Sequence, residues 1–321
     1  MEIQITDVLT KLFNILIFPG VLFQVVIGLL LAGIDRKVVA RMQHRVGPPI
    51  LQPTYDFFKL LGKETIVPHA ANKWIFLLAP VIGFIGLMIL ALFIPVFGYE
   101  VFSGSADLIV ILYLLTIPAI CLIVGGSASG SPYAGIGISR EMVTMMAYEL
   151  PLVIVFLTIA RKVGGSSLCF SLPAIQEWQV ANGSGLFHIS LLPAAVAMLL
   201  VIPAEVGTKP FDVAEAETEI CEGPLVEYSG TPLAFFKLNT AVKMFIMTSL
   251  FTALFLGGID TGMVWLNAVI LVAIAIVLTV ICMSTLNAIS ARLKIEHLFK
   301  FYWTIVAALA ASSLVLVWIG L

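Results

Sequence analysis

Apolar runs of about twenty residues recur along the chain, and they restrict its possible folds more than any other feature. A helical run of this length matches the ~30 Å hydrocarbon core of a bilayer. We expect about eight such spans, near residues 12–33, 74–97, 108–126, 142–160, 186–204, 232–256, 263–286 and 299–321. Since only 11% of the residues are charged, the sequence predicts an all-α integral membrane protein, one membrane domain over residues 1–321 with short cytoplasmic amphipathic helices.

A short polar segment between two apolar runs, residues 209–230, concentrates the negative charge. It contains six of the nineteen acids: Asp212, Glu215, Glu217, Glu219, Glu222 and Glu227. Asp212 and Glu215 have capping-box spacing and Gly223 stops a helix, so a helix is predicted over 213–222. Such a helix would place four acids on one stripe, with Glu217 on the far side. Mutual repulsion would raise some of their pKa values and suit proton transfer, although a solvated or base-paired acidic face remains the alternative.

Basic residues gather on one side of the predicted spans. With the N-terminus outside, loops 34–73, 127–141, 205–231 and 287–298 hold eleven of the seventeen Lys and Arg residues. The positive-inside rule then places these loops, including the acidic segment, in the cytoplasm. We therefore expect a multi-pass protein of the cell membrane with both termini outside.

Loop 34–73 contains a compact basic cluster. Its members are Arg36, Lys37, Arg41 and Arg45. The cluster is followed by a rigid turn at residues 47–49 and by a predicted amphipathic helix at 53–62. The basic side chains could bind lipid phosphates. Alternatively, they could pair with the acidic segment or, together with Lys209, dock a partner protein.

Ionisable side chains also occur within the predicted spans, where each costs at least ~2.5–3.5 kcal/mol. Lys243 and Glu149 are expected about 16 Å and 10 Å into their helices. We expect both to belong to a buried polar path, with a structural ion pair as the alternative. Lys237, Glu141 and Glu205 lie nearer the cytoplasmic ends, where Lys237 and Glu141 could also extend to the interface.

The sequence offers little sign of a metal site or redox cofactor in this chain. Its four cysteines are scattered without a CxxC pair, at Cys121, Cys169, Cys221 and Cys282. The four histidines also lack the spacing of metal ligands. Neither an iron–sulfur cluster nor a zinc site is therefore expected here.

Two motifs resemble the H-subunit (mitochondrial subunit 1) family of respiratory complex I. One is KPFDVAEAETE at 209–219, followed by EYSG at 227–230; the other is RVGP at 45–48, followed by LQP at 51–53, Asp56, KL at 59–60 and KE at 63–64. The resemblance implies a membrane subunit that docks a peripheral electron-transfer arm over loops 34–73 and 205–231. It also implies that the acidic segment and intramembrane acids begin a proton path toward antiporter-like subunits.

Three departures from the quinone-reducing members resemble the energy-converting membrane-bound [NiFe] hydrogenases and their relatives, including formate hydrogenlyase and archaeal sulfane-sulfur reductase. They are GPPI at 47–50 instead of GPNxxG, EICEGP at 219–224 instead of an ELVAG-like segment, and FKLN at 236–239 instead of an acid–tyrosine pair. This branch implies hydrogenase-like large and small subunits on the cytoplasmic face. Iron–sulfur clusters and a [NiFe] centre would belong to those partners.

The predicted function is that of a membrane anchor and ion-coupling subunit, which is not an enzyme on its own. The path is predicted to begin at the acidic stripe, pass Glu205 and Glu141, and reach Glu149 with Lys243 as its partner. The exported ion could be a proton or sodium. Alternatives are a quinone-site subunit of a NADH or ferredoxin:quinone oxidoreductase, the equivalent subunit of a polysulfide reductase, and a passive anchor.

Overall fold

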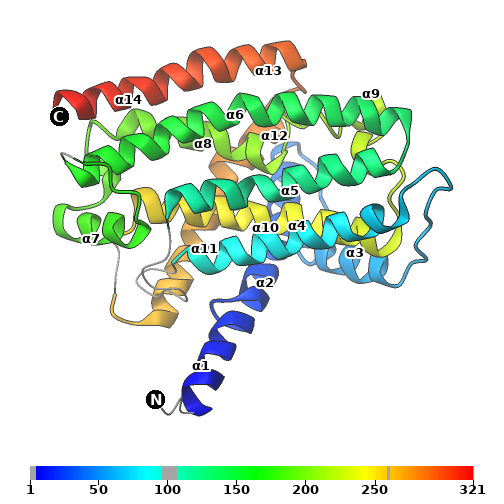
Figure 1. Ribbon diagram of the computed structural model, residues 1–321, viewed down its shortest axis with the longest axis horizontal. Coiled ribbons are helices and arrows are strands. Elements are labelled where there is room, and N and C mark those ends of the chain that lie inside the picture. The colour runs from blue at the N-terminus through cyan, green and yellow to red at the C-terminus, as the bar shows by residue number, and fades with distance from the viewer. Residues whose placement is uncertain (1–4, 96–106, 166, 259–260, 321) are drawn as a thin grey trace.

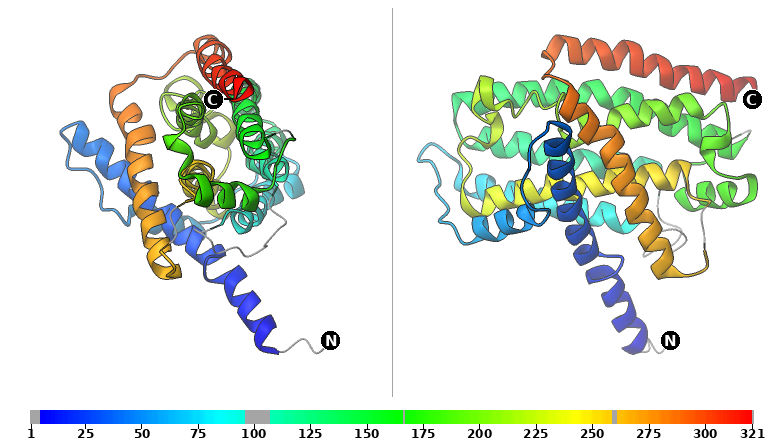
Figure 2. Two further views of the ribbon diagram at one scale, coloured as in Figure 1. Left: turned by 90° about the vertical axis from the view of Figure 1, so that its left-hand side faces the viewer. Right: turned by 180° about the vertical axis from the view of Figure 1, so that it is seen from behind.

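The computed structural model describes residues 5–95, 107–165, 167–258 and 261–320, and its regular elements there are helical. The expected span ends at 97 and 321, and the first four residues, lie outside this described part. Most long helices run side by side, while α2 and α11 cross the bundle obliquely (Figures 1 and 2). The longer helices are α2 (Val21–Met42), α4 (Lys73–Phe93), α5 (Leu108–Ala128), α6 (Pro132–Gly164), α8 (Leu192–Val206), α10 (Gly230–Phe255), α11 (Val264–Thr279) and α14 (Ala307–Ile319).

Short helices connect or extend the long ones. They are α1 (Ile5–Leu16), α3 (Gln52–Leu61), α7 (Leu172–Asn182), α9 (Glu217–Ile220), α12 (Thr285–Ile289) and α13 (Ile295–Phe301). The α3 helix confirms the element expected at 53–62. In the C-terminal third, π-helical turns at Val280–Ser284 and Tyr302–Val306 join α11 to α12 and α13 to α14. The sequence analysis did not anticipate these turns.

The centre of the bundle is α10. Its most apolar stretch is 94% buried, whereas the other candidate spans are 33–50% buried. The outer helices therefore turn apolar side chains outward, as contact with lipid requires, while α10 is surrounded by protein. Polar residues on α10, including Asn239 and Lys243, consequently lie in the interior.

Seven helical stretches in the described part are long and apolar enough to cross a membrane. These confirm an all-α integral membrane protein. The fifth expected span, 186–204, is instead the fifteen-residue α8, which begins beside Pro193. At 1.5 Å per residue it is roughly 22 Å long, less than the bilayer core. Because α8 is largely enclosed by other helices, its polar C-terminal end lies inside the protein.

Candidate functional site

The acidic segment does not form the helix expected over 213–222. Only α9, Glu217–Ile220, is α-helical there. Cys221 and Glu222 have φ values of 51° and 68°, and the chain turns back so that Gly223 approaches Ala214. A Cβ added at Gly223 would lie 2.2 Å from the Ala214 carbonyl oxygen, so the turn requires glycine. The expected single stripe of acids is therefore wrong.

The start of the acidic segment is fixed to residues 292–302, which include α13. The Leu293 amide donates to the Pro210 carbonyl at 3.1 Å, and Phe211 packs against the ring of Tyr302 at 5.3 Å between centroids. An ion pair joins Asp212 and Arg292 at 2.9 Å. These contacts hold residues 210–212 against the helices and direct the following residues inward.

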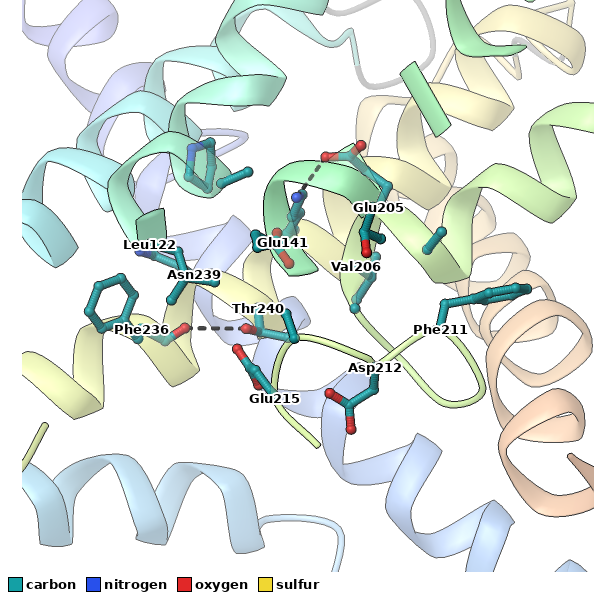
Figure 3. Close-up of a pocket in the computed structure, with 17 residues that line it drawn as sticks. Leu122, Glu141, Glu205, Val206, Phe211, Asp212, Glu215, Phe236, Asn239 and Thr240 are labelled. Carbon is teal, nitrogen blue, oxygen red and sulfur yellow. Dashed lines mark hydrogen bonds and ion pairs between the residues drawn. The ribbon is translucent and has the colours of Figure 1, made fainter. Parts of the chain in front are cut away.

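The folded segment brings carboxylates from three elements around one inner cavity of about 70 Å³ (Figure 3). Glu141 comes from α6, Glu205 from the end of α8, and Asp212 and Glu215 from the acidic segment. Lys243 of α10 also lines it. The structure thus brings together five of the predicted path residues from distant parts of the sequence.

The innermost charged contact is the ion pair between Lys243 and Glu205, with Nζ and Oε1 2.6 Å apart. Their side chains are only 8% and 2% exposed. The expected pairing of Lys243 with Glu149 is therefore not found. The reason is the inward position of α8, which carries Glu205 to Lys243, whereas Glu149 is half-buried and does not line this cavity. Glu149 still lies close enough to Glu205 for their charges to repel.

Burial determines the protonation behaviour of the two acids at the cavity mouth. It raises the pKa of Glu215 to about 8, and repulsion from Asp212, Glu141 and Glu222 adds to the effect. Burial also raises the pKa of Asp212, although Arg292 opposes the shift by hydrogen bonding and charge. The expected elevation of pKa values thus holds for these two acids, with desolvation as the largest cause.

A second cavity, the α3-side cavity, adjoins the inner one. It measures about 270 Å³ and lies between α2, α3, α10 and the acidic segment. Asp212 and Glu215 line both cavities. Glu217, Glu222 and Lys237 line only the α3-side cavity. These five side chains therefore connect the protein edge with the inner cavity.

Two predicted path residues in the acidic segment lie outside both cavities. Glu219 is exposed and pairs with Arg140 at 2.5 Å. Glu227 is half-buried in the EYSG motif, and the next residue of that motif packs against a neighbouring helix. There Tyr228 stacks on Phe76 with ring centroids 4.0 Å apart. Both acids are thus separated from the buried ion pair.

Sequence reasoning missed four residues that either interact with acids of the site or line a cavity. Arg140 and Arg292 were counted only as loop bases, although each pairs with an acid of the segment. Asp35 is 7% exposed, accepts a hydrogen bond from Ser284 at 2.7 Å, and lines the α3-side cavity. Tyr148 is 2% exposed and interacts electrostatically with Glu205. Its place beside Glu149 in the sequence was the available signal.

Within the described part of the chain, the basic cluster contacts neighbouring helix and loop residues. Arg36 pairs with Asp56 of α3 at 3.1 Å, and Lys37 contacts the Gly47 carbonyl at 3.5 Å. Arg41 is exposed at the end of α2. Arg45 bonds to Gln43. In the described part, the acids of the segment form their ion pairs with Arg140 and Arg292 instead of this cluster.

A basic pocket of about 630 Å³ opens where the end of α2 meets residues 287–292. Its lining contains four basic side chains and one acidic side chain. The basic ones are Arg36, Arg45, Lys209 and Arg292, and the acidic one is Asp35. The structure therefore brings three predicted docking residues together. Lys37 and Arg41 lie outside the pocket lining. Within residues 5–95, 107–165, 167–258 and 261–320, no group of three His, Cys, Asp or Glu side chains could hold a metal ion.

Replacing Arg292 with glutamine is expected to destabilise the acidic segment by about 1–3 kcal/mol, because Asp212 would lose its charged hydrogen-bond donor. The pKa of Asp212 should rise further, since Arg292 lowers it. Thermal unfolding of the purified complex measures the effect, with exposed Arg41→Gln as the matched control. Equal unfolding temperatures for the two variants would contradict a stabilising role for the Asp212–Arg292 pair.

Known proteins resemble the chain over nearly its full length. The sequence model of the family described as NADH dehydrogenase matches residues 14–318. The H-subunit of NADH-quinone oxidoreductase from Thermomicrobium roseum is 34% identical over 319 residues, covering 92% of each chain. Hydrogenase-4 component C of Escherichia coli is 36% identical over 229 residues, covering 71% of this chain and 70% of the relative.

A solved structure resembles the fold as well as the sequence. It is that of the membrane-bound sulfane sulfur reductase, an archaeal respiratory membrane complex. The matching chain has a TM-score of 0.87 and 31% sequence identity. The match covers 96% of this chain and 98% of that one.

Proposed function

The chain belongs to the NADH dehydrogenase family, and from this membership we propose that it is the membrane anchor and ion-coupling subunit of a redox-driven ion pump. Its relatives are subunits of oxidoreductase complexes. In this proposal, electrons stay in a docked hydrogenase-like arm with iron–sulfur clusters and a [NiFe] centre. Antiporter-like subunits in the cell membrane would export protons or sodium.

The observation that carries the proposal is the buried Glu205–Lys243 pair beside the inner cavity. Removing two charges from water costs several kcal/mol per ion unless their contacts compensate. Such a pair in a largely apolar interior is a functional hypothesis by default. Here it lies beside three further carboxylates, Glu141, Asp212 and Glu215, around a space of about 70 Å³. That volume can accommodate a few water molecules, and its polar lining could bind them.

The chain's own groups suggest how charge could move inward. Because its pKa is about 8, Glu215 is largely protonated near neutral pH and can exchange a proton with the docked arm. Ionisation of Glu215 would place negative charge beside Glu141 and favour protonation there. Charge at Glu141 would in turn act on the Glu205–Lys243 pair, which it faces across the inner cavity. Glu149 of α6, whose charge interacts with that of Glu205, would continue the path.

The direct test is ion uptake by inverted vesicles that contain the whole complex, measured per electron transferred. A coupling subunit predicts that a neutralising substitution at the inner cavity lowers uptake while the complex stays assembled. A passive anchor predicts unchanged uptake in every assembled variant. Sodium-free and sodium-containing buffers distinguish sodium from proton export.

We place docking of the arm at the basic pocket, because four bases from separate parts of the sequence surround it. Arg45→Glu is expected to release the arm during purification, since acids on the arm would meet a carboxylate there. The measurement is the ratio of arm to membrane subunits after gel filtration, with Lys11→Glu as the control on the opposite side. If the Arg45→Glu complex retains a fully active arm, Arg45 does not dock the arm and instead contacts lipid headgroups.

A quinone-site role is the second candidate, and the α3-side cavity is the observation that favours it. Apolar side chains from three helices line this cavity, including Leu29, Phe57 and Met244, and acids from α2, α3 and the acidic segment also line it. Such a mixed lining suits a ring with polar oxygens. The departures at 47–50, 219–224 and 236–239 favour an acceptor other than a quinone, either protons or polysulfide. Assaying the purified complex with each acceptor distinguishes these cases.

A further inference from the structure

An open groove of about 740 Å³ lies between the beginning of α4 and the beginning of α10. None of its residues lines the inner or the α3-side cavity. We call it the interfacial groove because it lies where two membrane helices begin. Its lining includes His69, Lys73, Leu77, Val81 and Phe235.

The interfacial groove changes character with depth. Lys73 is the first residue of α4, where a membrane helix meets the headgroups. Leu77 and Val81 follow on the same helix, about 6 Å and 12 Å deeper. Among the described residues, the lining includes a lysine and a histidine near the surface but no carboxylate. A cationic mouth above an apolar channel matches an anionic headgroup with its acyl chain.

The walls of the groove are held by specific contacts. The Ile66 amide donates to the Ser229 hydroxyl at 3.0 Å, and the Asn72 amide donates to the Ala128 carbonyl at 3.0 Å. Gly230 has φ 61°, and a Cβ there would lie 2.8 Å from the Glu64 carbonyl oxygen. Deeper in the membrane, Phe235 packs edge-to-face on Phe84 at 5.6 Å. The loop before α4 is thus fixed against α10, and the groove between them is preformed.

We propose that the interfacial groove binds one anionic phospholipid. Its phosphate lies beside Lys73 and His69, and an acyl chain follows Leu77, Val81 and Phe235. Basic side chains at a membrane surface attract anionic lipids, and a lysine whose stem lies along apolar surface keeps its ammonium at headgroup level. A membrane helix of another subunit would not require the cationic mouth, so the charge favours a lipid occupant.

Native mass spectrometry of the detergent-purified complex tests this assignment with added phosphatidylglycerol. Lys73→Gln is expected to weaken binding about fivefold, the contribution of one basic residue near an anionic surface. Val81→Trp should exclude the acyl chain and abolish binding while electron transfer continues. Lys59→Gln, an exposed base of α3 outside the groove, is the matched control and should bind like the parent.

Two further measurements identify the ligand. Phosphatidylcholine should bind more weakly than phosphatidylglycerol, and inorganic phosphate should not displace the lipid. Equal lipid retention by Lys73→Gln, Val81→Trp and Lys59→Gln would overturn the proposal. Displacement of the lipid by inorganic phosphate alone would show that the groove binds free anions. Absence of lipid from the parent complex would show that another subunit covers the groove. Either result would also reject the phospholipid proposal.

Discussion

Glu205→Gln is expected to abolish ion uptake per electron and to destabilise the purified complex by about 3–5 kcal/mol, the usual cost of leaving one member of a buried pair unpartnered. The Lys243 side chain is 8% exposed, and its ammonium contacts the Glu205 carboxylate at 2.6 Å. A neutral amide would leave that buried charge without its anionic partner. Electron transfer in the arm need not stop, because the substitution lies within the membrane part.

A double-mutant cycle separates stability from coupling at this pair. Lys243→Met alone should also destabilise the complex, because it leaves the Glu205 carboxylate buried without its cation. Glu205→Gln combined with Lys243→Met removes both charges and should recover much of the lost stability. Ion uptake should nevertheless remain absent in the double variant, since no titratable pair is left. Restored uptake in that variant would show that the pair serves structure alone.

Glu215→Gln is expected to block the path at the cavity mouth and to flatten the pH dependence of stability. The Glu215 carboxyl has a pKa of about 8 in the folded protein and an ordinary value of 4.5. Between these values the unfolded chain releases the proton while the folded protein retains it. Stability is therefore lost as pH rises through this interval, with a total loss on the order of a few kcal/mol.

The measurement is the unfolding temperature of the complex from pH 5 to pH 8.5. The parent should lose stability across this range more steeply than Glu215→Gln, and ion uptake by the variant should fall at least tenfold. Glu296→Gln, an exposed acid at the start of α13, is the matched control and should behave like the parent. Parallel stability curves for the parent and Glu215→Gln would exclude this carboxyl as the group that titrates.

Several features followed from the sequence because they depend on composition and local pattern. Apolar runs of membrane length specify helices, since an unpaired backbone cannot cross lipid. The bases around 34–73 and the acids of 209–230 fall on the same predicted side, and the structure brings Lys209 to the basic pocket with Arg36 and Arg45. The α3 helix also appeared where its amphipathic pattern placed it.

Only the tertiary structure determined which charges meet. The partner of Lys243 depends on the depth of α8 and on the rotation of α6 and α10, and no local pattern specifies either. The ion pair of Asp212 with Arg292 joins residues 80 positions apart. A capping-box pattern predicted a helix over 213–222, but packing of residues 210–212 on residues 292–302 and the close turn at Gly223 outweigh that local preference. Long-range packing thus moves Glu215 into the interior, where desolvation raises its pKa.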